Sequence, residues 1–178
     1  MTKPRGILIF GPNGSGKTTL GRELARILGF RHMDIEEYYF EPSEIPYTAP
    51  RPLEKRLALM LADIEKRRGF VISSVTGDFG DIIPQYYGLA VYLSAPLALR
   101  MERIRRRAHD QHGDRVLKGG DMHEQEQAFF AWAAARDLSK IDQWAKTLAC
   151  PVIYVDGAKD WRVNAAEVAE EYLALSNE

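Results

Sequence analysis

The chain has 178 residues and a formal net charge of −1, with 24 lysines and arginines against 25 aspartates and glutamates. Without an excess of positive charge, it has no overall field that favours nucleic acid or a membrane surface. The length fits one compact α/β domain over residues 1–178. We therefore expect a small molecule as its partner, and neither nucleic acid nor a membrane. The single cysteine, Cys150, excludes a disulfide within the chain and suits a cytoplasmic protein.

The first predicted elements are a strand over residues 5–10 and a helix over residues 16–28. Between them stands Gly11-Pro12-Asn13-Gly14-Ser15-Gly16-Lys17-Thr18-Thr19, with the spacing G-x-x-x-x-G-K-T of a phosphate-binding loop. The alternative is a glycine-rich strand–helix turn that binds nothing. The complete match between a strand and a helix favours the phosphate-binding loop.

Each residue type in this loop has a chemical reason. Glycines allow backbone conformations in which successive N–H groups point inward and surround an anion. Lys17 can reach the β- and γ-phosphates of a nucleotide, and the Thr18 hydroxyl can bind Mg²⁺. We expect ATP to be held by these loop residues: Gly11, Asn13, Gly14, Ser15, Gly16, Lys17, Thr18 and Thr19.

Strands and helices alternate through the rest of the chain. A short second strand is predicted within residues 31–35, ending at Asp34, and a proline-punctuated loop follows it. We assign residues 35–68 to the acceptor side of the site. The remaining predicted elements are helix 53–64, strand 70–72, a short helix or turn at 79–87, strand 89–93, helix 96–108, helix 122–147 with a break near Ser139, strand 151–155 and helix 161–175. This alternation predicts a mostly parallel sheet with right-handed crossovers.

The helix over residues 96–108 is predicted to have two faces. Its buried face comprises Leu97, Met101, Ile104 and Ala108, and its other face comprises Arg100, Arg103 and Arg107, joined by Arg106. A solvated charged surface is the simpler interpretation, but few acids accompany these arginines. The segment 109–121 is polar, and with His109, His112 and His123 it suggests either a mobile flap or a zinc site. Without a cysteine partner, the flap is favoured.

Ligands of parallel α/β sheets bind beyond the carboxyl ends of the strands. Asp34 and Asp78 both follow predicted strands, so we expect them near Lys17. An acceptor hydroxyl needs a carboxylate that takes its proton. Asp34 is the first candidate for this role and Asp78 the second, while either could instead hold Mg²⁺ through water. Asp34 could also simply cap a helix.

With these residues in view, the chain resembles the adenylate-kinase and shikimate-kinase branch of small P-loop kinases. Leu93-Ser94-Ala95-Pro96 and Arg103-Ile104-Arg105-Arg106-Arg107 are similar to the family's strand, its helix before the lid and its R-x-x-x-R signature. The resemblance implies a three-layer P-loop fold with a five-stranded parallel sheet and an arginine-rich lid over about residues 105–125. By the same resemblance, the nucleotide contacts are Arg103 on adenine, Arg107, Arg115 and Arg136 on phosphate, and Gly157 and Lys159 beside adenine.

The acceptor side departs from adenylate kinases. Glu36 and Glu37 stand where those enzymes carry an arginine, and no arginine follows the third strand. The acidic run resembles kinases that phosphorylate a hydroxyl, which implies acceptor contacts from Asp34, Glu37, Tyr38 and Asp78. Tyr38 could equally well pack in the core. The prediction is a Mg-ATP-dependent small-molecule kinase, with a nucleoside monophosphate kinase or a nucleotide-dependent regulatory ATPase as alternatives.

Overall fold

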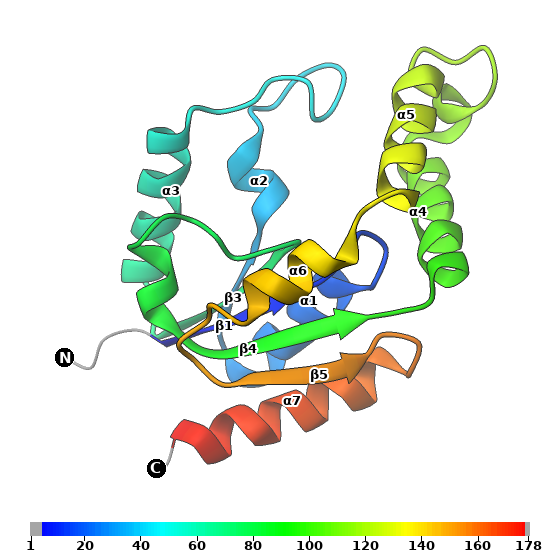
Figure 1. Cartoon of the computed structure of the whole chain (residues 1–178). Coiled ribbons are helices and arrows are strands. Elements are labelled where there is room, and N and C mark those ends of the chain that lie inside the picture. The colour runs from blue at the N-terminus through cyan, green and yellow to red at the C-terminus, as the bar shows by residue number, and fades with distance from the viewer. Residues whose placement is uncertain (1–4, 177–178) are drawn as a thin grey trace.

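The computed structural model describes residues 5–176, and its centre is a five-stranded parallel sheet (Figure 1). The strand order is β2-β3-β1-β4-β5, so β1 lies between β3 and β4. The strands are β1 (Arg5–Phe10), β2 (Arg31–Asp34), β3 (Gly69–Ser74), β4 (Tyr87–Ser94) and β5 (Val152–Asp156). The helices are α1 (Lys17–Leu28), α2 (Ile35–Tyr39), α3 (Leu53–Glu65), α4 (Leu97–His112), α5 (His123–Ala134), α6 (Leu138–Ala145) and α7 (Trp161–Ser176), with short 3₁₀ turns at Ile83–Tyr86 and Gly113–Val116. The predicted parallel sheet and its strand count are confirmed.

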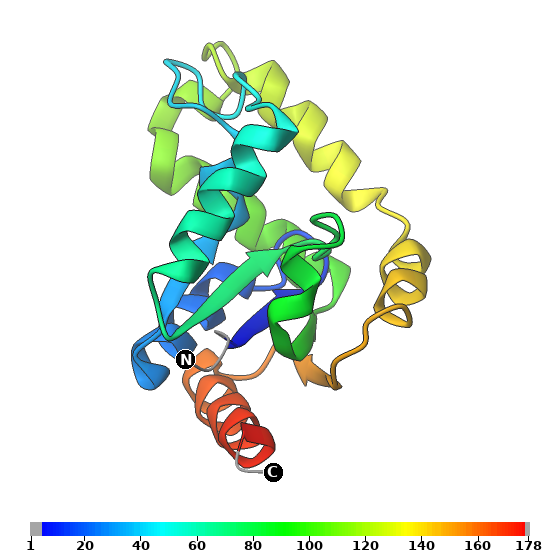
Figure 2. The ribbon, with the colours of Figure 1, turned by 90° about the vertical axis from the view of Figure 1, so that its left-hand side faces the viewer.

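Helices cover both faces of the sheet, as the continuous apolar runs in its strands require. Side chains of β1 alternate between two cores. Ile7 and Ile9 pack with α1 and α7, whereas Leu8 and Phe10 pack with α3 and α6. Figure 2 shows the sheet between these layers. This sandwich fixes the carboxyl end of β1, where the phosphate-binding loop begins.

His32 lies beneath α1 and links that helix to the sheet. Its Nε2 is 2.9 Å from the Ser73 hydroxyl oxygen, and the Ser73 hydroxyl donates to the carbonyl of Lys17 at 3.0 Å. Gly21 makes room for this contact, because a Cβ there would lie 2.5 Å from the Ser73 hydroxyl oxygen. Burial lowers the pKa of His32 to about 4. The imidazole is therefore neutral at pH 7 and positions the start of α1.

We expect the free energy of unfolding to fall as the pH drops from about 6.5 towards 4. In that window the unfolded chain protonates His32 while the folded chain does not, so protons favour unfolding. The loss is on the order of 2 kcal/mol for a partly exposed group. Urea titrations of the wild type and His32→Gln at several pH values measure it. The wild type should lose more stability than the variant, and equal losses would contradict the buried neutral histidine.

Residues 97–134 form a helical hairpin that stands beyond the sheet (Figure 1). The polar flap predicted over 109–121 is only partly found, because α4 continues to His112 and a 3₁₀ turn follows. The hairpin has its own small core of Met101, Ile104, Ala108, Val116, Met122, Phe130 and Ala133. The predicted break near Ser139 is present, since the Asp137 carboxylate caps α6 by accepting from the Ser139 N–H at 3.0 Å. Within residues 5–176, no helix is long and apolar enough to cross a membrane.

The predicted faces of α4 need correction at two positions. Leu97 is 47% exposed and Arg100 only 3% exposed, so the helix turns Arg100 inward. Met101, Ile104 and Ala108 are buried as predicted. Arg100 is tolerated inside because its guanidinium reaches backbone carbonyls, which replace the water that it loses.

Candidate active site

The glycines of the loop after β1 adopt backbone conformations that side chains disfavour. Gly14 has φ 79° and Gly11 has φ 143°. A Cβ on Gly14 would collide with the Arg100 carbonyl, and one on Gly11 with the Leu93 carbonyl. The loop is therefore pressed against β4 and α4, and it leads into α1 at Lys17. Lys17 bends back over the loop, where its Nζ donates to the Pro12 carbonyl at 2.8 Å.

Two arginines hold this loop from outside. Arg100 donates to the carbonyls of Ala95 at 3.1 Å and Asn13 at 3.3 Å. Arg136 donates to the Asn13 side-chain oxygen at 3.0 Å and stacks on Trp132 at 4.1 Å. Arg136 lines neither cavity described below. The observed contact of Arg136 is therefore with the loop. Arg100 also supports the loop, although the sequence analysis had placed it on the arginine face of α4.

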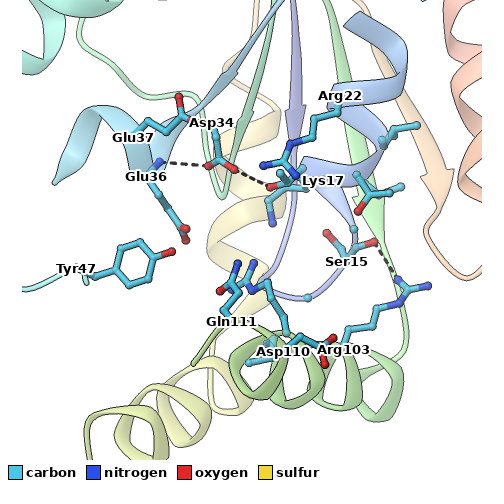
Figure 3. Close-up of a pocket in the computed structure, with 18 of the residues that line it drawn as sticks. Ser15, Lys17, Arg22, Asp34, Glu36, Glu37, Tyr47, Arg103, Asp110 and Gln111 are labelled. Atoms are coloured by element: carbon cyan, nitrogen blue, oxygen red, sulfur yellow. Dashed lines mark hydrogen bonds between the residues drawn. The ribbon is translucent and has the colours of Figure 1, made fainter. Parts of the chain in front are cut away.

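A cavity of about 1070 Å³ lies over the loop (Figure 3). It gathers most of the predicted nucleotide residues: Gly14, Ser15, Gly16, Lys17, Thr18, Thr19, Arg103, Arg107, Gly157 and Lys159. Asp34 and Glu37 from the predicted acceptor set also line it. Arg103 lines the cavity beside the loop, and its Nη1 donates to the Ser15 carbonyl at 3.2 Å.

The cavity lining holds seven lysines and arginines against five aspartates and glutamates, so its net charge is moderately positive. Arg22 and Arg106 join Lys17, Arg103 and Arg107 in its lining. Burial, and next the Arg107 guanidinium, lower the pKa of Lys17 to about 7. A polyphosphate placed here would reverse that effect, because an adjacent anion favours the protonated amine. The donors and charges of the site therefore fit the phosphates of a nucleotide.

Asp34 ends β2 and stands beside the start of α1. Its Oδ2 accepts from the Thr18 hydroxyl at 3.0 Å, and its Oδ1 accepts from the Glu36 N–H at 3.3 Å. The second contact caps α2, which is the alternative role that the sequence analysis gave to Asp34. A hydroxyl next to a carboxylate is the oxygen donor set that suits Mg²⁺.

Glu36 is a cavity-lining carboxylate to which the sequence analysis gave no site role. Figure 3 shows its carboxylate and the Tyr47 hydroxyl pointing toward one another, while Glu37 points away. Burial raises the pKa of Glu36, and the Arg107 guanidinium opposes part of that rise. Tyr47 has a φ of 64°, a left-handed conformation that costs energy for a side chain of this size. The loop holds it there, and burial with the Glu36 charge raises the pKa of Tyr47 to about 12.

A second cavity, of about 450 Å³, adjoins the first. Its walls carry the side chains of Tyr39, Phe129 and Trp132. The residues that line both cavities are Glu36, Phe40, Tyr47, Ile104, Arg107 and Gln111. The two cavities therefore meet at a carboxylate and a guanidinium.

Besides Arg136, three further predicted site side chains lie away from both cavities. Tyr38 is buried in the core, where its hydroxyl donates to Asp63 at 2.6 Å, so it takes the packing role that its sequence position had left open. Asp78 is exposed in the loop after β3 and lines neither cavity. Arg115 pairs with Asp121 at 2.8 Å on the outer end of the hairpin and also lines neither. In the described part of the chain, no group of three or more histidine, cysteine or acidic side chains is arranged so that it could hold a metal ion.

Comparison with known proteins agrees with this geometry. Residues 7–129 match the family model described as "AAA domain". The chain belongs to that family, within the small P-loop kinases of the shikimate and nucleotide kinase-like superfamily. It is 30% identical over 160 residues to "Uncharacterized protein YqaC" of Bacillus subtilis (strain 168), covering 85% of this chain and 88% of that one.

Several relatives of this P-loop kinase family member carry a named activity. The chain is 33% identical over 110 residues to "Shikimate kinase" of Acinetobacter baylyi, covering 56% of this chain and 61% of the relative, which is less than two thirds of its length. The solved structure "Shikimate kinase from Acinetobacter baumannii in complex with shikimate" aligns with a TM-score of 0.58 and 24% identity, over 98% of this chain and 95% of that one. This structural likeness confirms the fold.

Proposed function

We propose that the protein transfers the γ-phosphate of ATP to a hydroxyl of a small molecule. The observation that carries this proposal is the junction of the two cavities at Glu36 and Arg107. The larger cavity suits ATP, and the smaller one suits the acceptor. At their junction a carboxylate can take a proton while a guanidinium neutralises phosphate charge.

The residues of the larger cavity have separate tasks. The loop N–H groups and Lys17 hold the β- and γ-phosphates, and Arg107 approaches them from α4. Thr18 and Asp34 would hold Mg²⁺, which supplies further neutralisation of phosphate charge. Gly157 and Lys159 border the adenine, and Arg103 covers it. This division places Asp34 at the metal, because its Oδ2 lies beside the Thr18 hydroxyl, the other proposed oxygen donor.

Glu36 takes the role of general base in place of Asp34. The acceptor O–H proton passes to the Glu36 carboxylate, the acceptor oxygen bonds to the γ-phosphorus, and the bond from that phosphorus to the bridging oxygen of ADP breaks. The raised pKa of Glu36 makes it a better proton acceptor than an ordinary carboxylate. The Tyr47 hydroxyl orients the group (Figure 3).

The hairpin of α4 and α5 acts as the lid in this proposal. Its α5 touches the proline-rich loop, where Gln125 Nε2 donates to the Pro46 carbonyl at 3.2 Å. Arg115 would have to exchange Asp121 for a phosphate when the lid closes. Such closure excludes water and suppresses idle hydrolysis of ATP.

Arg103→Ala is expected to weaken ATP binding about tenfold, because a guanidinium that lines the nucleotide cavity is lost. Arg105→Ala is the matched control on the same helix. Arg105 lines neither cavity and lies 5.8 Å above the Phe130 ring, so its loss should change binding less than twofold. Calorimetric titration with ATP measures both variants. Equal effects would mean that Arg103 does not contact the nucleotide.

The proposal is tested by incubating the protein with Mg²⁺ and ATP labelled at the γ-phosphate. The panel of acceptors holds nucleosides, nucleoside monophosphates, sugars, polyols and shikimate-like acids, and one control has no acceptor. Labelled product from a hydroxyl compound supports the proposal. Label on a nucleoside monophosphate would favour a nucleotide kinase. Label that appears only as free phosphate would favour a regulatory ATPase.

A further inference from the structure

Aromatic rings face the smaller cavity from two separate parts of the chain. Tyr39 and Phe40 come from α2 and the residue after it, and Phe129 and Trp132 come from α5. Figure 1 shows α2 and α5 beyond the same end of the sheet, on either side of the loop after β1. Aromatic walls of this kind favour a flat ring, which they can sandwich or contact edge-on.

The charges of the smaller cavity are unusual for a site that takes an acid. Glu36 lies at the junction with the larger cavity, and Glu126 lines the smaller cavity from α5 with 7% of its surface exposed. Arg107 is the one arginine or lysine among the described lining residues, and it also lines the larger cavity. The nearby Arg136 is engaged with Asn13 and Trp132. An anionic acceptor would therefore face two carboxylates without a cation of its own.

We infer that the acceptor is a ring-bearing alcohol without a carboxylate or phosphate group, neutral or cationic, such as a nucleoside or a hydroxymethyl heterocycle. This inference rests on the proposed function. The ring of the acceptor lies between the aromatic side chains of α2 and α5. The acceptor's N–H or cationic groups face Glu126, and its hydroxyl faces Glu36. Carboxylate and phosphate groups are disfavoured because Arg107, the one arginine or lysine among the described lining residues, is shared with the nucleotide phosphates and lies among two carboxylates.

Matched pairs of compounds test the inference directly. The pairs are adenosine with its monophosphate, cytidine with its monophosphate, and pyridoxine with pyridoxate. Binding to the wild-type protein with Mg-ADP is measured by calorimetry at about pH 8. Phosphorylation of the same compounds is measured separately with γ-labelled ATP. At least one neutral member should bind about tenfold or more tightly than its anionic partner.

Substitutions at two positions of α5 add a charge-specific readout. Glu126→Lys should reduce or reverse the preference for the neutral member, because it places a cation in the cavity. Glu124→Lys is the matched control on the exposed side of the same helix, and it should keep the wild-type preference. Glu126→Gln, which is nearly isosteric, should also reduce the preference for the neutral member, because it removes one carboxylate from the cavity.

The outcomes separate this inference from the proposed function. Tighter binding of an anionic member, or no binding of any neutral ring compound, would overturn the inference even if some acceptor is phosphorylated. Binding of neutral ring compounds with label released only to water would support the inference about the cavity and contradict the kinase. Binding and labelling of the same neutral compound supports both.

Discussion

Lys17→Ala is expected to reduce phosphoryl transfer by about 10²–10³-fold, the loss typical of removing one group that stabilises developing charge. Lys17 lines the cavity over the loop, and its only hydrogen bond described is the one to the Pro12 carbonyl. Burial already lowers its pKa to about 7, so its charge costs free energy in the free protein. The substitution should therefore leave the free energy of unfolding close to that of the wild type. Initial rates of ADP formation and urea denaturation measure the two effects.

Lys118→Ala is the control, because Lys118 is an exposed lysine at the outer end of the hairpin. It should keep both the rate and the stability of the wild type. Wild-type turnover in Lys17→Ala would remove Lys17 from the mechanism. A large loss of stability with unchanged turnover per folded molecule would assign Lys17 a purely structural role.

Glu36→Gln is expected to lower kcat about 10²-fold, within the range for loss of a general base. Glutamine keeps the size of the side chain and can still bond with Tyr47, but it cannot take the proton of the acceptor. The KM for ATP should change little, because the phosphates are held by the loop and the arginines. In the wild type, kcat/KM should rise as the pH rises through the pKa of Glu36, which burial places above its usual range. Glu36→Gln should lose that rise.

Glu37→Gln provides the comparison on the adjacent residue. The Glu37 carboxylate points away from Tyr47 and the junction (Figure 3), so its loss should be much smaller than that of Glu36. Comparable losses at both positions would contradict Glu36 as the base. A larger loss in Asp34→Asn that removes the pH dependence would restore Asp34 to the role first predicted for it.

The phosphate-binding loop was predictable because its function depends on residues that are adjacent in sequence. Gly11, Gly16 and Lys17 each sit where a strand–loop–helix unit needs them, and the structure gives Gly11 and Gly16 positive φ values. The parallel sheet was also predictable, because each apolar strand and each helix between strands is a local pattern in the sequence. Arg100 was misplaced because helical periodicity cannot tell a buried arginine that bonds to carbonyls from an exposed one.

The acceptor side was less predictable because distant segments form it. Glu36 lies two residues after Asp34, and only the structure shows that Asp34 turns to Thr18 while Glu36 turns to the junction. Tyr47 reaches Glu36 from a loop whose path no sequence pattern defines. The place of Arg22 in the lining of the larger cavity could have been predicted, since Arg22 lies one helical turn beyond Thr18 on α1.

The most direct test of phosphoryl transfer follows the oxygen that attacks the γ-phosphate. ATP is turned over in water enriched in the heavy oxygen isotope with the best acceptor of the panel, and the phosphorylated product is isolated for mass spectrometry. A kinase gives a phosphate ester whose bridging oxygen comes from the acceptor, with no heavy oxygen incorporated, and little free phosphate. Free phosphate that carries one heavy oxygen for each ATP consumed, with or without acceptor, would show that water is the nucleophile and would contradict the account.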